Sequence, residues 1–359
     1  MFPNAITAFA PSCSNALRIS TSALDEIERG GANTLILAGG DGTMQAAITS
    51  SINRRRFVAQ PNYVALPCGM TNVIANDCGL PGPPATSLDN FLWRRDHGQI
   101  RRVERPLIGM QLSERQDPIY GFFLGAGLFH TAVQFSRQNI QRIGAKRSLA
   151  VALSTVSFIL KSALDSADGP APLQAQIRDA NGDLIDRDMS IILMTTLTKL
   201  SANIFPFWGE GEAPMNVMAI DYPRRRLLEA AFAVLRGRSE HWFPEAGFHS
   251  WKDNELRMRF DGPVVFDGEI YHAAPGDDLI FKVSEKPLSS SDGAALPGCG
   301  ARAFTPLSPT SPRRRLMNRR AFWSRRSSRN IRARPCCFTD PARASAGARA
   351  PPTSSMIFM

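Results

Sequence analysis

A glycine-rich turn with a single carboxylate lies near the start of the chain, in Gly39-Gly40-Asp41-Gly42-Thr43. The apolar run 35–38 before it predicts a buried strand, and residues 44–52 after it predict a helix. Glycines let backbone N–H groups approach phosphate oxygens closely, and a helix N-terminus adds partial positive charge there. A carboxylate beside phosphates needs a compensating cation, usually Mg²⁺. The motif predicts a nucleoside-triphosphate site with Asp41 as metal ligand, although a tight turn without function is the simpler alternative.

A second unit of the same kind follows in the sequence. Residues 63–67 predict a strand, Gly69, Thr71 and Asn72 lie in a loop, and residues 73–78 predict a helix. Two successive strand–loop–helix units indicate a parallel sheet with both loops at the carboxyl edge of its strands, where open α/β sheets bind ligands. Thr71 and Asn72 would donate neutral hydrogen bonds to a ligand there, or one of them caps the helix.

Two carboxylates stand much later, in Phe266-Asp267-Gly268-Glu269. Side chains two residues apart on a strand point to the same side, which suits a pair acting on one substrate and equally a solvated turn. The residues themselves leave both interpretations open.

Taken in order, these motifs resemble the catalytic domain of diacylglycerol kinases, a family that includes sphingosine and ceramide kinases and bacterial lipid kinases. The apolar segment Phe122–Phe129, with its Gly-x-Gly, resembles the start of the family's second domain. The resemblance implies an ATP- and Mg²⁺-dependent kinase that phosphorylates a lipid hydroxyl, on a diacylglycerol-like or sphingoid lipid.

The resemblance also implies a role for each site residue. The nucleotide would be bound by Gly39, Gly40, Asp41, Gly42, Thr43, Gly69, Thr71 and Asn72. Asp267 would act as general base on the lipid hydroxyl, and Glu269 would orient or assist it. Positioning and charge neutralisation by Mg²⁺ would supply most of the remaining catalysis.

Three features depart from the family pattern. The usual upstream strand with Asn-Pro-x-Ser/Ala-Gly is not found, which implies a chain truncated at its N-terminus. Ala46 stands where the family often has an acid, and Met70 stands where it usually has threonine. A catalytically inactive lipid-binding or regulatory homologue is therefore an alternative. An enzyme like NAD kinase or phosphofructokinase is another, because these share Gly-Gly-Asp-Gly.

The order of predicted elements divides the chain into three parts. Residues 1–105 alternate helix and strand, which predicts a doubly wound α/β nucleotide domain that is incomplete at its start. Strand-like runs dominate residues 106–286, with helices expected at 145–164 and 227–236. This part resembles the family's lipid-substrate domain, a mainly antiparallel β-sandwich. Phe205, Phe207 and Trp208 would either line a lipid entrance or pack in the core.

Residues 287–359 form a C-terminal tail of different composition. This segment has 13 Arg, no Lys and two acids, so it holds all of the chain's net charge of +10, and the remainder is close to neutral. The composition predicts disorder. Its arginines would contact anionic lipid, or the segment is an extension without function. The high overall charge therefore gives no argument for a specific nucleic-acid partner.

The rest of the sequence bounds the cellular setting. The six cysteines and five histidines show no zinc-ligand spacing. The N-terminus lacks a signal-peptide pattern, and no apolar run is long enough to span a bilayer. We therefore expect a cytoplasmic protein that contacts the inner membrane surface peripherally. The identity of the lipid and the oligomeric state are left open.

Overall fold

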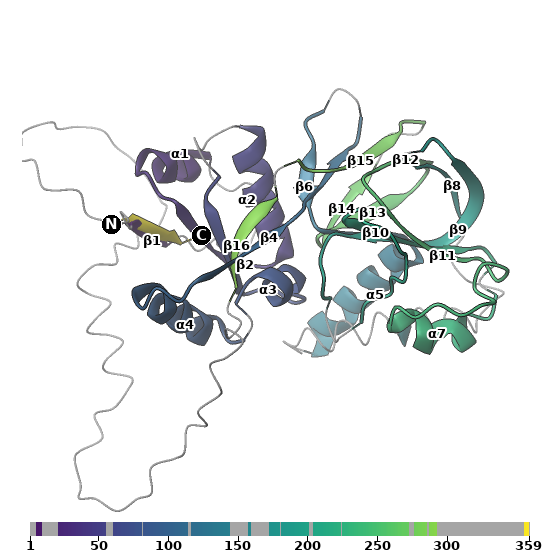
Figure 1. The fold of residues 1–359 in the computed structure, drawn as a ribbon, viewed down its shortest axis with the longest axis horizontal. Coiled ribbons are helices and arrows are strands. Elements are labelled where there is room, and N and C mark those ends of the chain that lie inside the picture. The colour runs from purple at the N-terminus through teal and green to yellow at the C-terminus, as the bar shows by residue number, and fades with distance from the viewer. Residues whose placement is uncertain are drawn as a thin grey trace, which may run out of the picture.

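The protein is represented by a computed structural model that describes residues 5–8, 21–54, 60–80, 82–113, 116–143, 157–158, 172–179, 181–200, 204–223, 225–272, 276–285, 287–292 and 355–358. These residues form two sheets that lie side by side, with helices packed on both (Figure 1). The helices are α1 (Thr21–Arg29), α2 (Asp41–Asn53), α3 (Val73–Cys78), α4 (Pro84–Asp96), α5 (Leu128–Ile143) and α7 (Leu227–Leu235). Within the described part of the chain, no helix has the length and apolar character needed to cross a membrane.

The first sheet has six strands in the order β1-β17-β2-β3-β16-β4. They are β1 (Ala5–Ala8), β2 (Thr34–Gly39), β3 (Asn62–Pro67), β4 (Arg101–Arg105), β16 (Leu288–Asp292) and β17 (Ser355–Phe358). Strands β2 and β3 pair in parallel from Thr34 opposite Asn62 to Gly39 opposite Pro67. Both glycine loops therefore leave the sheet at the same edge, as the sequence predicts.

Alternation along β2 explains why helices cover both faces of this sheet. Leu35 and Leu37 are fully buried in one core cluster with residues of α1, α2 and α3. Ile36 points the opposite way and packs with Phe91 of α4 in a second cluster. The predicted doubly wound α/β domain is confirmed.

The second sheet has eleven strands and is mainly antiparallel, in the order β14-β13-β7-β9-β8-β12-β15-β5-β6, with β10 pairing β9 and β11. Its strands are β5 (Ile108–Gln111), β6 (Ile119–Gly121), β7 (Phe123–Gly127), β8 (Leu173–Arg178), β9 (Leu184–Thr195), β10 (Met215–Asp221), β11 (Phe248–Asp253), β12 (Glu255–Phe260), β13 (Pro263–Phe266), β14 (Glu269–His272) and β15 (Leu279–Val283). The predicted antiparallel β-rich domain is confirmed, but a single curled sheet takes the place of two separate ones (Figure 1). One face of the sheet encloses a core, and α5 and α7 lie on the other.

Three elements differ from the sequence-based expectation. One is β17, which pairs with β1 and β2 in the first sheet although the sequence analysis assigned its residues to a disordered tail. Helix α5 follows directly after Gly127, where no helix is predicted, while the helix expected at 145–164 falls almost entirely outside the described residues. Strand β16 belongs to the first sheet, with Leu288 and Ser290 buried, although the sequence analysis assigned these residues to the tail. The polar sequence Leu-Ser-Ser-Ser-Asp gives little sign of a strand, and pairing with β3 and β4 creates it. Residues 293–354, for which disorder is predicted, lie outside the described residues.

Candidate active site

The carboxylate of Asp41 joins the two glycine loops. Asp41 is the first residue of α2 and is buried. Its Oδ2 accepts a hydrogen bond from Thr71 Oγ1 at 2.6 Å, and its Oδ1 accepts one from the backbone N–H of Ile74 at 2.9 Å. Burial raises the pKa of Asp41, and the hydrogen bonds from Thr71 and Ile74 offset this only in part. Asp41 therefore fixes the second loop against the start of α2.

Close backbone packing explains the glycines of both loops. A Cβ atom on Gly69 would lie 2.5 Å from Cα of Gly40, a distance that real Cβ atoms do not show. A Cβ atom on Gly39 would lie 2.5 Å from Cβ of Thr43. The first loop thus folds tightly onto the helix, and the second loop packs directly on the first.

Asn72 closes the second loop on itself. Its Oδ1 accepts a hydrogen bond from the Gly69 N–H at 2.7 Å, and its Nδ2 donates one to the Gly69 carbonyl at 2.9 Å. Asn72 occupies the N-cap position of α3 with φ +51° but makes no side-chain cap hydrogen bond. The side chain of Asn72 therefore does not cap α3. The side chain of Thr71 does not cap it either, since the Thr71 hydroxyl donates to Asp41.

Asp267 sits in the tight turn between β13 and β14, with φ +46°. One carboxylate oxygen accepts a hydrogen bond from the backbone N–H of Phe122, and the other accepts one from that of Phe123, both at 2.9 Å. Burial and, second, the negative charge of Asp41 raise the pKa of Asp267 well above its ordinary value of 3.8. The two carboxylates are therefore electrostatically coupled.

Glu269 reaches from the same turn to the first glycine loop. A Cβ atom on Gly42 would collide with Oε1 of Glu269 and lie 3.1 Å from its Cγ. Between the two acids, the carbonyl of Gly268 accepts a hydrogen bond from Arg137 of α5. The Asp-Gly-Glu turn of the second domain and the glycine loop of the first are thus in contact.

One cavity of about 350 Å³ connects these groups to an apolar channel. Its polar end is lined by Gly40, Asp41, Gly42, Thr71, Arg137, Asp267 and Glu269. Its apolar part runs between the second sheet and the helices α5 and α7, with side chains such as Phe129, Ile191 and Val234 in its wall. A volume of this size is typical of a small-molecule site.

Helix α2 also contacts the residues that flank the Asp-Gly-Glu turn. Gln45 is buried, and its Nε2 donates to the carbonyl of Phe266 at 3.0 Å. The hydroxyl of Tyr271 donates to Gln45 Oε1 at 2.6 Å. This amide thereby bridges the residues on either side of the Asp-Gly-Glu turn.

The same helical face makes two further contacts with the second domain. Thr49 Oγ1 donates to the carbonyl of Tyr120 at 3.2 Å and accepts from its N–H at 2.9 Å. Asn53 Nδ2 donates to the carbonyl of Pro118 at 2.8 Å. Because residues 45, 49 and 53 are spaced by four, they lie on one face of α2 and tie the glycine loop to the second domain.

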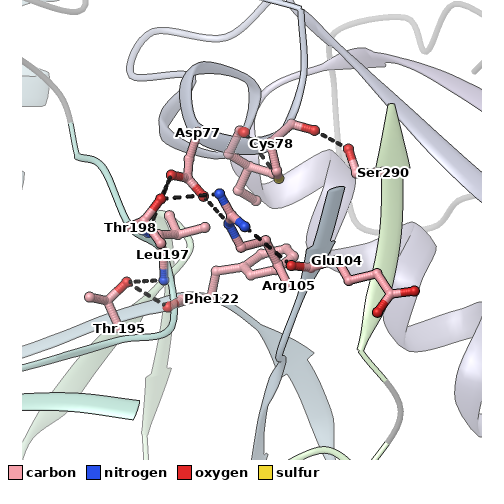
Figure 2. A network of polar contacts seen from close by, with 10 residues as sticks. Asp77, Cys78, Glu104, Arg105, Phe122, Thr195, Leu197, Thr198 and Ser290 are labelled. Carbon is pink, nitrogen blue, oxygen red and sulfur yellow. Dashed lines mark hydrogen bonds and ion pairs between the residues drawn. The ribbon is translucent and has the colours of Figure 1, made fainter. Parts of the chain in front are cut away.

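Asp77 centres a second contact between the domains, in which an ion pair within the first domain is extended to Thr198 of the second (Figure 2). Asp77 of α3 accepts from Arg105 Nε at 2.7 Å with one carboxylate oxygen. With the other it accepts from Thr198 Oγ1 at 2.6 Å and from the Thr198 N–H at 3.2 Å. Helix α3 is therefore tied to Asp41 at its start and to the second domain at its end.

The structure thus gathers all the predicted site residues at one place. Gly39, Thr43, Gly69 and Asn72 shape the loops, and the remaining predicted residues line the cavity, namely Gly40, Asp41, Gly42, Thr71, Asp267 and Glu269. The aromatic cluster is different, because Phe205, Phe207 and Trp208 pack into a core cluster, while their neighbours Ile204 and Pro206 line the cavity. Sequence reasoning missed Gln45, Thr49, Asn53, Arg137, Asp77 and Arg105. The polar stripe along α2 is the signal that would have found three of them.

The described residues contain no cluster of three or more His, Cys, Asp or Glu side chains able to hold a metal ion by themselves. Kinase sites need fewer protein ligands, because Mg²⁺ keeps waters and binds substrate phosphates in addition to one or two carboxylates. Asp41 and Glu269 both line the cavity, and the Glu269 side chain lies against Gly42, the residue that follows Asp41.

The fold and the site define a two-domain α/β protein in which two glycine loops of the first domain meet a carboxylate turn of the second. Residues 15–103 match the family model of the diacylglycerol kinase catalytic domain. The resemblance indicated by the motifs is confirmed for this part of the chain.

Solved structures share the architecture at low sequence identity. Two structures of a protein assigned as a diacylglycerol kinase from Bacillus anthracis strain Sterne superimpose with TM-scores of 0.55 and 0.53. Each is 11% identical and covers 78% of this chain and 83% of its own. This likeness supports the fold. No curated protein matches the chain significantly in sequence.

Proposed function

We propose that the protein is an ATP-dependent lipid kinase that transfers the γ-phosphoryl group to a lipid hydroxyl. The observation that carries this proposal is the single cavity that joins two phosphate-type glycine loops, a buried carboxylate and an apolar channel. ATP phosphates would lie on the loops at the N-terminus of α2, whose dipole favours negative charge. The lipid chain would occupy the channel, with its hydroxyl beside Asp267.

Asp267 is the general base in this proposal. Each of its oxygens accepts one backbone hydrogen bond and keeps a second lone pair for a substrate hydroxyl. The hydroxyl proton passes to Asp267 as the lipid oxygen forms a bond to the γ-phosphorus. The bond from that phosphorus to the bridging oxygen breaks, and ADP leaves with the electron pair. A carboxyl pKa raised well above its ordinary value makes Asp267 a stronger base than an exposed aspartate.

Asp41 and Glu269 would hold the Mg²⁺ that accompanies ATP. Bound there, Mg²⁺ would neutralise the charge of the phosphates during transfer. A cation would also lower the cost of two coupled buried carboxylates. We expect Asp41→Asn to weaken Mg²⁺-ATP binding, measured by calorimetry at fixed free Mg²⁺, more than it weakens ATP binding in EDTA, where only the lost hydrogen bond between the loops counts.

A catalytically inactive lipid-binding homologue is the second candidate. It is favoured by Met70, which is exposed at the cavity in place of the family's usual threonine. An enzyme that phosphorylates NAD is a third, because the first glycine loop alone does not distinguish it.

Labelled ATP with Mg²⁺, NAD and a total lipid extract separates the three. The lipid kinase yields label in the organic phase, which mass spectrometry assigns to one lipid. The inactive homologue binds ATP or lipid but transfers no label, and an NAD kinase labels NAD in the aqueous phase. Asp267→Asn serves as the blank, since contaminating kinases would be unaffected by it.

A further inference from the structure

The outer side of α7 carries an exposed apolar stripe. Leu228 and Phe232 are 47% and 62% exposed, and they are four residues apart on the same face. On the same helix, Ala231 and Leu235 line the cavity. Counted around the helix, Ala231, Leu235, Leu228 and Phe232 follow one another within about 100° of its circumference. The apolar lining of the cavity therefore continues without a polar break onto the surface.

Arginines flank this stripe at both ends of the helix. Arg225 and Arg226 precede α7, and Arg236 and Arg238 follow it, all with exposed side chains. The guanidinium of Arg236 lies 3.9 Å from the centre of the Phe232 ring, so charge and apolar surface adjoin. Glu229 is the acid on the helix, and it pairs with Arg226 at 2.6 Å. The net charge of this surface is positive.

We propose that the face of α7 carrying Leu228 and Phe232 docks on the surface of an anionic lipid bilayer. An apolar and aromatic stripe bordered by arginines is the pattern of a helix that lies in a membrane interface. Arginine stems cover apolar surface while their charged ends reach the headgroups. The continuity with the cavity gives the substrate a path from the bilayer to Asp267 without crossing water. This path, but not the docking itself, rests on the proposed lipid kinase function.

Co-sedimentation with vesicles tests the docking. The probes are vesicles of phosphatidylglycerol and phosphatidylcholine at 3:7, and vesicles of phosphatidylcholine alone. Leu228→Gln with Phe232→Gln should reduce affinity for the mixed vesicles at least about tenfold. Arg236→Gln with Arg238→Gln should reduce it by about fivefold per arginine, on the mixed vesicles only and less at high salt.

Leu184→Gln is the matched control. Leu184 is 52% exposed at the start of β9, where it pairs with Arg178 of β8 and is no part of the α7 stripe, so its replacement should leave vesicle binding unchanged. Equal thermal midpoints for all variants exclude unfolding. Activity toward a short-chain diacylglycerol below its micellar concentration should be the same in the parent and the Leu228/Phe232 variant.

The outcomes separate the two proposals. Parental vesicle affinity in the Leu228/Phe232 variant overturns the docking proposal even if lipid is phosphorylated. Vesicle binding that depends on these residues, without transfer to any lipid, supports docking and overturns the kinase. The docking proposal is also overturned if the parent protein does not bind vesicles but forms a dimer on size-exclusion chromatography that the Leu228/Phe232 variant does not form. The face of α7 would then be a protein interface.

Discussion

The side chain of Glu269 lies directly against Gly42, so that the carboxylate turn of the second domain touches the glycine loop of the first. Gly42 has no positive φ, which means that its backbone alone does not require glycine. The space that Glu269 occupies is the reason for glycine at this position.

Gly42→Ala should therefore damage the site without damaging the fold. The new methyl group displaces the flexible end of Glu269, and we expect kcat to fall at least about tenfold, the loss of roughly one well-oriented group. The thermal midpoint should shift by less than about 2 °C, since alanine favours the helix and displaces only the end of the flexible Glu269 side chain. Gly30→Ala is the control, because a Cβ there makes only ordinary contacts. An unchanged kcat would show that the position of Glu269 does not matter for turnover.

The hydroxyl of Thr71 should matter for nucleotide binding through Asp41. Thr71→Val removes the 2.6 Å hydrogen bond to a buried carboxylate, which costs about 2 kcal/mol. Because this bond holds the second loop on the first, ATP affinity measured by calorimetry should fall about tenfold. Thr71→Ser keeps the hydroxyl and should bind ATP like the parent. Equal loss in both variants would contradict this account, because serine keeps the hydroxyl that valine lacks.

The ion pair between Asp77 and Arg105 should be a large term in stability. Asp77 has no exposed side-chain surface, so Arg105→Met leaves a buried charge without its cation. Removing one partner of such a pair costs about 3–5 kcal/mol. Adding Asp77→Asn should recover part of the loss in urea unfolding, because the amide keeps a hydrogen bond with Thr198. Strictly additive losses would show that the two side chains do not interact.

Periodicity gave most of the fold because burial repeats every two residues along the strands. Strands β2 and β3 are found where the apolar runs before the two glycine loops predict them. Helix α5 was missed, since its apolar residues continue directly from strand β7. Strand β16 depends on partners far away in the sequence, which local composition does not reveal.

The glycine loops of the candidate site could be predicted from the sequence, but the residues that hold these loops and the Asp-Gly-Glu turn in place could not. The glycine motifs carry a local signal, because close approach of backbones requires them. Arg137 and Asp77 have no such local signal in the sequence. The role of each depends on the partner that the fold places beside it, the Gly268 carbonyl for Arg137 and the Arg105 guanidinium for Asp77. The double role of Asp41, as loop clamp and proposed metal ligand, also appears only when Thr71 and Ile74 are seen beside it.

Turnover should rise with pH through the raised pKa of Asp267. Only the ionised carboxylate accepts a proton, so below that pKa kcat should increase about tenfold per pH unit. The free energy of unfolding should change with pH in the opposite direction. The unfolded chain loses this proton near pH 3.8 while the folded protein keeps it to higher pH, so unfolding free energy falls as pH rises between the two values. Urea unfolding across this pH range should show that the unfolding free energy of Asp267→Asn falls less steeply with pH than that of the parent. An equal slope in the two proteins would show that Asp267 is not the source of the fall.

The most direct measurement is single-turnover transfer from labelled ATP to the lipid by Asp267→Asn, beside Asp261→Asn. Asp261 is exposed in the turn before β13 and serves as the matched substitution. The account predicts that Asp267→Asn binds ATP and lipid like the parent but transfers phosphate about 10²–10⁴ times more slowly, while Asp261→Asn is unaffected. Transfer by Asp267→Asn at the parental rate would contradict it.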